Sequence, residues 1–121
     1  MELQRLELDF TVCKIDSIEQ VDFSRGFVFL SKTDDEISLV SESAYIPPGT
    51  IAFEAGWKAL KISGILDFEM IGVIAKISKI LAEAAIGIFV VSTFNTDYIF
   101  LKAEYFERGL QALIYNGYVI I

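Results

Sequence analysis

The chain has 121 residues, 54% of them hydrophobic, and a formal net charge of −7 from 17 acidic and 10 basic side chains. This much apolar material can bury a core in one domain or two small lobes, which excludes an intrinsically disordered chain. The acidic excess argues against binding to nucleic acid, because affinity for phosphates rests on clustered Lys and Arg. Apolar runs are too short to cross a bilayer, and the first residues do not lead into a signal peptide. We therefore expect a cytoplasmic protein that does not bind membranes.

The sequence contains no histidine and one cysteine, Cys13. Histidine is the commonest general base and the commonest metal ligand, so its absence argues against an enzyme without excluding one, and catalysis would have to rest on carboxylates, Tyr or Lys. We predict no metal and no cofactor. Cys13 lies among apolar residues, which indicates a small buried side chain in a strand. The acidic residues 34–36 are adjacent, and adjacent side chains on a strand point in different directions. They predict a solvated hairpin tip rather than a metal site.

The chain begins with a predicted strand over residues 6–15, where apolar and polar residues alternate. This period is typical of a half-buried strand with Leu8, Phe10, Val12 or their neighbours facing inward. Residues 16–22 offer capping side chains but are too few for a long amphipathic helix. We expect a short helical turn or a loop there.

Two apolar runs follow, residues 26–31 and 36–40, and a polar turn separates them. This pattern predicts a β-hairpin. Residues 41–56 contain both prolines, which exclude a central strand and indicate a connection between lobes. Part of that connection, residues 51–55, is expected to form a helical turn.

The second half predicts two helices among four strands. Asp67 is expected to cap the first helix, whose buried face would include Ile77 and Leu81 and whose outer face would include Lys76. The second helix, residues 104–116, would bury an apolar face that includes Ile114. In chain order we expect a strand over residues 57–66, a helix that follows Asp67 and has its apolar positions within 73–84, two hairpin strands over 86–92 and 98–102, a helix over 104–116 and a strand over 118–121.

This β-α-β-β-α-β order predicts an α+β fold of the ferredoxin-like kind, with two helices on one face of an antiparallel sheet. The first half looks like a reduced copy: Ser31 corresponds to Ser92 at an offset of 61, but about three helical turns are missing before the first hairpin. We therefore predict a tandem duplication with a degenerate first copy. Its parts would be a reduced lobe at 1–50, a connection at 51–56 and a complete domain at 57–121.

Two polar segments of the second copy suggest a ligand site. A helix that starts after Asp67 presents free N–H groups to a ligand carboxylate, and Gly72 removes a side chain where a ligand approaches. Asp97 is suited to accept hydrogen bonds from an ammonium group, and Ser92 and Thr93 add hydroxyls. We expect the turn and the hairpin to converge on one pocket. Structural roles stay open: Asp67 as a helix cap, Gly72 as a close-packing residue and Asp97 as a hairpin brace.

These segments also resemble a known family. The likeness rests on residues 56–61, Gly64, Leu66, Asp67, Phe68, Gly72, Val73, Ala75, Leu81, Ala82, Ile88, Phe89 and residues 92–99, and on residues 32–38 in the first half. They resemble the ACT domain, an amino-acid-binding regulatory module, and more closely small proteins with tandem ACT-like repeats, which are related to the ACT repeats of aspartate kinases and of the animal cytosolic arginine sensor. The resemblance implies ligand binding without catalysis, and it implies a homodimer, because ACT-type sheets pair edge to edge. The ligand-binding residues that it implies are Asp67, Phe68, Ile71, Gly72, Val73, Ser92, Thr93, Asn95 and Asp97.

Two other functions stay open at this point. The chain is also consistent with a protein-interaction module whose pocket is vestigial and whose apolar surface serves a partner. An enzyme that uses Asp67, Asp97 or Tyr98 as acid or base is the third alternative.

Overall fold

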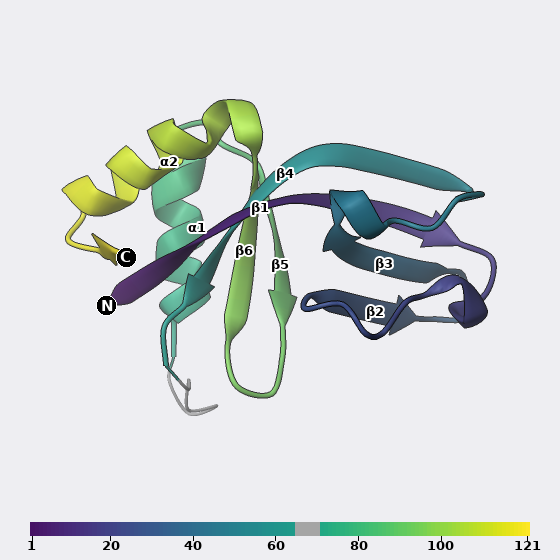
Figure 1. Cartoon of the computed structure of the whole chain (residues 1–121). Helices are drawn as coiled ribbons and strands as arrows, with labels where there is room; N and C mark the ends of the chain where they lie inside the picture. The colour runs from purple at the N-terminus through teal and green to yellow at the C-terminus, as the bar shows by residue number, and fades with distance from the viewer. Residues whose placement is uncertain (65–70) are drawn as a thin grey trace. The chain divides into compact units, whose positions relative to one another are not determined.

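The computed structural model describes residues 1–64 and 71–121 (Figure 1). The predicted alternation of strands and helices is confirmed, and the fold is a mixed α+β fold. Its strands are β1 (Glu2–Ile15), β2 (Val28–Lys32), β3 (Ile37–Glu42), β4 (Ala52–Ile62), β5 (Ile88–Ser92), β6 (Asp97–Lys102) and β7 (Val119–Ile120). Its helices are α1 (Val73–Glu83) and α2 (Ala103–Tyr115), with the single 3-10 turns η1 (Ile18–Gln20) and η2 (Ser43–Tyr45).

The chain divides into two compact units: unit 1 is Met1–Glu7 with Lys58–Ile121, and unit 2 is Leu8–Trp57. Strands β1 and β4 contribute residues to both units. Because two strands continue from one unit into the other, the contact boundary does not define domain limits. The division at 1–50, 51–56 and 57–121 stays a prediction.

In unit 1 the strands lie in the order β7, β1, β4, β6, β5. The start of β1 is hydrogen-bonded on both sides: the Ser63 N–H donates to the Glu2 carbonyl at 3.1 Å, and the Ile121 N–H donates to the Leu3 carbonyl at 2.9 Å. β7 pairs with β1 in parallel. A bare β-α-β-β-α-β sheet has no such strand between its first and last strands, so residues from the chain's beginning complete unit 1.

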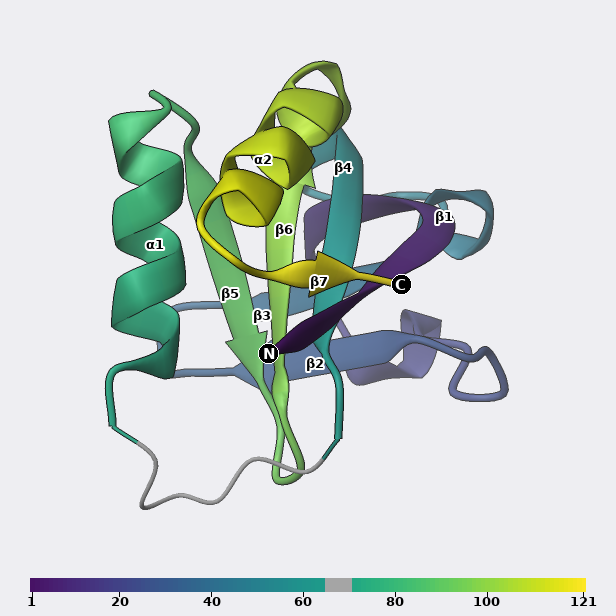
Figure 2. The ribbon, with the colours of Figure 1, turned by 90° about the vertical axis from the view of Figure 1, so that its left-hand side faces the viewer.

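Both helices of unit 1 cover the same face of its sheet (Figure 2). The predicted burial of Ile77 and Leu81 on α1 is confirmed, and both are 0% exposed. On α2 the prediction for Ile114 was wrong, because this side chain is 47% exposed. The core of unit 1 consists of Leu3, Leu60, Ile62, Ile77, Leu81, Ile86, Ile99, Leu101, Phe106, Leu110 and Leu113.

In unit 2 the strands lie in the order β2, β3, β1, β4. Cys13 packs with Ile15 and Leu39 in its core, which confirms the predicted buried cysteine. The short turn expected in residues 16–22 is η1. The helical turn expected at residues 51–55 was wrong: Ala52 begins β4, and the Ile51 N–H donates to the Lys14 carbonyl at 2.8 Å. Backbone pairing with β1 holds this stretch in an extended conformation. The helical turn of the connection is η2, which precedes it in the chain.

The two hairpins correspond at an offset of 60, one less than the 61 expected from the sequence. The Thr33 N–H donates to the Glu36 carbonyl at 2.9 Å, and the Thr93 N–H donates to the Thr96 carbonyl at 2.8 Å. The strand bounds of β2 and β3 coincide with those of β5 and β6 at the same offset. Identical side chains suggested the offset of 61, whereas backbone hydrogen bonding decides the correspondence.

Candidate functional site

Helix α1 starts later than the predicted cap allows. Its N-cap is Gly72, which has φ +79° and forms no side-chain capping bond. The prediction of Asp67 as the residue that caps this helix was therefore wrong, and Asp67 and Phe68 themselves lie outside the described residues. A Cβ added to Gly72 would meet nothing within 4 Å, so close packing does not explain this glycine. Its left-handed backbone does, because glycine adopts that conformation without steric cost.

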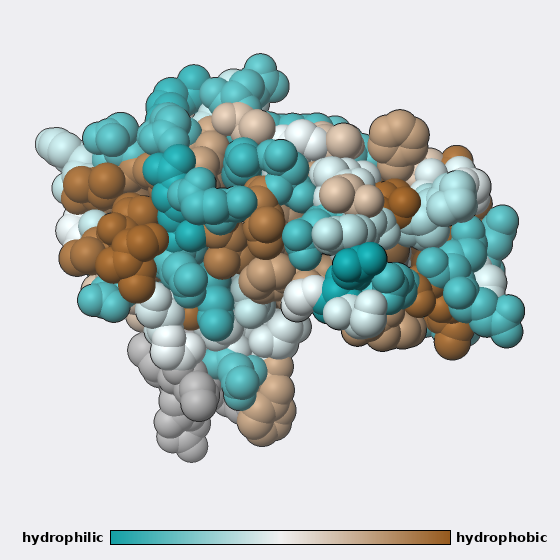
Figure 3. Space-filling view, in the orientation of Figure 1, coloured by the Kyte–Doolittle hydropathy of each residue, from teal (hydrophilic) through white to brown (hydrophobic). Residues whose placement is uncertain are grey.

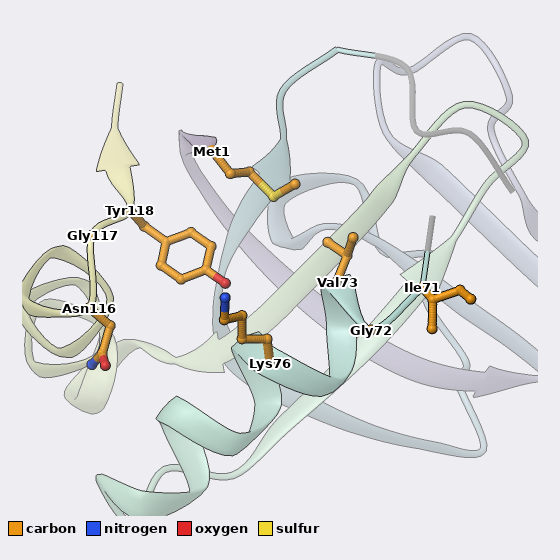
Figure 4. A pocket seen from close by; sticks show the side chains of 8 residues that line it. All are labelled: Met1, Ile71, Gly72, Val73, Lys76, Asn116, Gly117 and Tyr118. Atoms are coloured by element: carbon orange, nitrogen blue, oxygen red, sulfur yellow. The ribbon is translucent and has the colours of Figure 1, made fainter. Parts of the chain in front are cut away.

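A hollow of about 310 Å³ opens beside this helix start in unit 1 (Figure 4). Three segments meet there: the first turn of α1, the beginning of β1 and the turn from α2 into β7. The residues that line it are Met1, Ile71, Gly72, Val73, Lys76, Asn116, Gly117 and Tyr118. Ile71, Gly72 and Val73 were expected at a ligand site, and the structure brings these three to one hollow.

Two polar side chains of the hollow converge. Figure 4 shows Lys76 and Tyr118 pointing toward one another, whereas Asn116 points away from them. The Asn116 amide donates instead to the Ala112 carbonyl at 2.8 Å, at the end of α2. Burial raises the pKa of Tyr118 above its ordinary value, so its hydroxyl stays protonated at neutral pH. Among the described lining residues, Lys76 carries the one charged side chain.

The backbone of α1 adds donors to this hollow. The Lys76 N–H donates to the Gly72 carbonyl at 3.0 Å, which is the first hydrogen bond of the helix. The N–H groups of the residues between them have no acceptor within the helix. Together with the positive end of the helix dipole, they favour an anion at this position.

The β5–β6 hairpin holds the other predicted site residues that the structure describes, Ser92, Thr93, Asn95 and Asp97, and none of them lines the hollow. Ser92 pairs with Asp97 as the last rung of the ladder. The Thr93 hydroxyl donates to the Thr96 carbonyl at 3.1 Å, and Asn95 is exposed at the tip. The lining of this hollow contains no residue of the hairpin, and the predicted convergence of hairpin and turn, like the ligand roles of the hairpin residues, stays a prediction.

Sequence reasoning missed a buried anchor in this hairpin. Thr96 is 3% exposed, and its hydroxyl donates to the Ile62 carbonyl at 2.8 Å. The bond ties the hairpin tip to the end of β4. A threonine next to a turn is a weak signal in a sequence, because its partner is 34 residues away.

The hollow also contains residues that the sequence did not indicate. Lys76 was assigned to the outer face of α1, yet it stands one helical turn after Gly72 and therefore on the same side as the helix start. Tyr118 was assigned only to the last strand. Neither position carries a local pattern that indicates a site; proximity in the fold reveals it.

A model of the ACT domain matches residues 52–114, just over half of the chain. The chain belongs to the ACT domain family. This match covers β4, α1, the β5–β6 hairpin and most of α2, and it includes Gly72 and Lys76 from the hollow. No curated protein matches the sequence of this ACT protein.

Solved structures share the fold of this ACT protein. Protein Atu0741 of Agrobacterium tumefaciens superposes with a TM-score of 0.86 at 28% identity, covering 99% of this chain and 91% of that one. An aspartate kinase of Clostridium acetobutylicum gives 0.65 at 16% identity, covering 91% of this chain and 33% of that one. The ligand-free regulatory subunit of aspartate kinase from Thermus thermophilus gives a TM-score of 0.58 at 15% identity, covering 89% of this chain and 93% of that one. At such low identities, the two kinase structures support the fold alone.

Residues 1–64 and 71–121 contain neither a membrane-spanning helix nor a cluster of metal-binding side chains. No helix there is long and apolar enough to span a membrane. No group of three or more Cys, Asp or Glu side chains in the same ranges is placed to hold a metal ion.

Proposed function

We propose that this ACT protein is a non-enzymatic regulatory module that binds an amino acid or a similar small molecule in the hollow at the start of α1. The observation that carries the proposal is the opening of that hollow at Gly72, where the backbone of the helix start is uncovered. ACT domains are typically small-molecule binding modules with regulatory roles. The fold shared with the regulatory subunit of an aspartate kinase agrees with such a role.

The size of the hollow supports a single small ligand. Binding sites for small molecules enclose about 300 to 1,000 Å³. At about 310 Å³ the hollow lies at the lower end of this range. It suits one amino acid rather than a nucleotide cofactor.

The proposed site extends beyond the described lining. We assign Asp67 and Phe68 to it from the sequence, as neighbours of the helix start. The hairpin residues Ser92, Thr93, Asn95 and Asp97 do not line the hollow of their own chain, so we propose that they complete a site at a subunit interface. Such an interface requires a homodimer.

An exposed apolar edge supports association between copies. β7 lies at the edge of the unit 1 sheet, and Val119 and Ile121 are 52% and 57% exposed. Figure 3 shows hydrophobic surface in the region where Figure 1 places both chain ends. An unpaired edge with apolar side chains favours pairing with another strand. Sedimentation velocity over a range of concentrations tests the dimer, and Val119→Lys should shift it toward monomer.

We also propose that the chain is a tandem duplication related to the repeats of the arginine sensor. The turn η2 supports this, since it begins at Ser43 and α2 begins at Ala103, again at an offset of 60. The residues before them, Glu42 and Lys102, have φ/ψ of −58°/135° and −60°/141°. A cytoplasmic location, with no nucleic-acid or membrane partner, completes the proposal.

The experiment is a thermal-shift screen of the twenty amino acids at millimolar concentration, followed by calorimetric titration of any that stabilise the protein. Gly72→Leu should abolish the shift, because the side chain enters the helix start. Gly49→Leu is the matched control: Gly49 has φ +76° and open space around it, but lies in unit 2. Both substitutions carry the same backbone strain. Equal loss of ligand binding in both would contradict the assignment to this hollow.

The rival function, a protein-interaction module, rests on the apolar edge at β7. It would be favoured if no amino acid stabilised the protein and Val119→Lys still changed its association state. An activity that survives substitution of Asp67, Asp97 and Tyr98 would dismiss these residues as catalytic groups.

A further inference from the structure

The hollow contains two hydrogen-bond donors that approach each other from distant parts of the chain. Lys76 comes from the first turn of α1, and Tyr118 follows the end of α2. Within the ranges that the structure describes, neither side chain forms a hydrogen bond or an ion pair. An ammonium group and a protonated phenol that point toward one another present a cation and an O–H donor to the same space.

The other side chains of the lining are apolar except for Asn116, which points away from Lys76 and Tyr118. Met1 and Val73 contribute aliphatic side chains, and the ring of Tyr118 contributes an apolar face beneath its hydroxyl. Gly72 and Gly117 contribute backbone alone. A ligand in this hollow therefore meets the Lys76 ammonium and the Tyr118 hydroxyl, the apolar side chains of Met1 and Val73, and the exposed backbone of Gly72 and Gly117.

We propose that the hollow binds the carboxylate of an aliphatic amino acid between the Lys76 ammonium and the Tyr118 hydroxyl, with the aliphatic side chain against Met1 and Val73. This inference rests on the proposed function and specifies the ligand class and its orientation. Free N–H groups of the first turn of α1 lie at the same end as Lys76 and add to the attraction for an anion.

The expected size of each contribution follows from its chemistry. A charge-assisted hydrogen bond contributes more than a neutral one, so loss of the Lys76 ammonium should weaken binding at least tenfold. Loss of the neutral Tyr118 hydroxyl should weaken binding about two- to tenfold. Added salt should weaken the wild-type complex, because Lys76 is exposed and its charge is screened.

The test measures thermal shift and calorimetric affinity for five probes: L-leucine, 4-methylpentanoate, 3-methylbutan-1-amine, L-lysine and L-glutamate. The second and third probes keep the leucine skeleton but lack the amino group and the carboxylate, respectively. We expect binding of leucine and 4-methylpentanoate, and none of the amine. In amide NMR spectra, addition of L-leucine should shift the signals of Val73 and Gly117.

Variants separate the inference from the proposed function. Lys76→Met and Tyr118→Phe should weaken leucine binding as stated, whereas Lys79→Met, on the same helix but outside the hollow, should not. If leucine binds wild type and both hollow variants equally, the orientation is wrong and the proposed function stands. Binding of the amine but not of 4-methylpentanoate would also overturn this inference. A preference for lysine or glutamate over leucine would do the same. In both cases the proposed function stands. If none of the twenty amino acids binds, both proposals fail.

Discussion

Thr96→Val removes one buried hydrogen bond while it preserves the shape of the side chain. The Thr96 hydroxyl donates to the Ile62 carbonyl at 2.8 Å, and Thr96 is 3% exposed, so water cannot replace the lost donor. Leaving a buried polar group without its partner costs about 1–3 kcal/mol. We expect the free energy of unfolding to fall by about 1–2 kcal/mol, a measurable part of the roughly 5–15 kcal/mol typical of such domains.

Urea denaturation followed by circular dichroism measures this change. The midpoint of Thr96→Val should fall at an unchanged slope, since the surface exposed on unfolding stays the same. Thr93→Val is the matched control: its exposed hydroxyl bonds within the same turn, and its loss should change stability by about 0.5 kcal/mol or less. The reasoning is refuted if Thr96→Val unfolds with the midpoint of the wild type, or if both variants lose the same stability.

Burial raises the pKa of Tyr118, so the folded protein keeps a proton that the unfolded chain releases near pH 10. The free energy of unfolding should therefore fall as the pH rises above about 10. Urea titrations at several pH values should show a smaller fall for Tyr118→Phe. Gly109→Ala should lower stability by about 1 kcal/mol despite alanine's better helix propensity, because its Cβ would lie 2.6 Å from Leu101 Cδ2. Gly87→Ala is the control and should leave stability unchanged, because a Cβ at Gly87 would meet nothing within 4 Å. Thermal melts of both variants measure the difference. The Cys13 thiol is 4% exposed and burial raises its pKa, so a thiol reagent should modify it only on unfolding; rapid reaction of the native protein would contradict this.

Much of the architecture was predictable because it depends on local spacing. Alternation along residues 6–15, the three-and-four spacing of Ile77 and Leu81, and polar turns between apolar runs each follow from the periods of strands and helices. The helix stop at residues 116–117 was also predictable: Asn116 is the C-cap and Gly117 has φ +93°.

Errors arose where a partner elsewhere in the chain decided the local conformation. Residues 51–55 have no strong propensity of their own, and their pairing with β1 made them a strand. Identical serines suggested the hairpin offset of 61, which the backbone ladder corrected to 60. Ile114 fits the apolar spacing of α2 but lies at the edge of the buried face.

The candidate site was predictable in part, since Gly72 was expected from the start of a helix after a turn, and Ile71 and Val73 from the resemblance to ACT domains. By itself, the amino-acid sequence determined the order of elements, the buried faces and the resemblance to ACT domains, because these depend on residues close together along the chain. Only the tertiary structure placed the start of β1 between β7 and β4, bonded Thr96 to Ile62, and brought Lys76 to Tyr118. These three depend on segments tens of residues apart, whose meeting is set by the packing of the whole unit and leaves no periodic trace in the sequence.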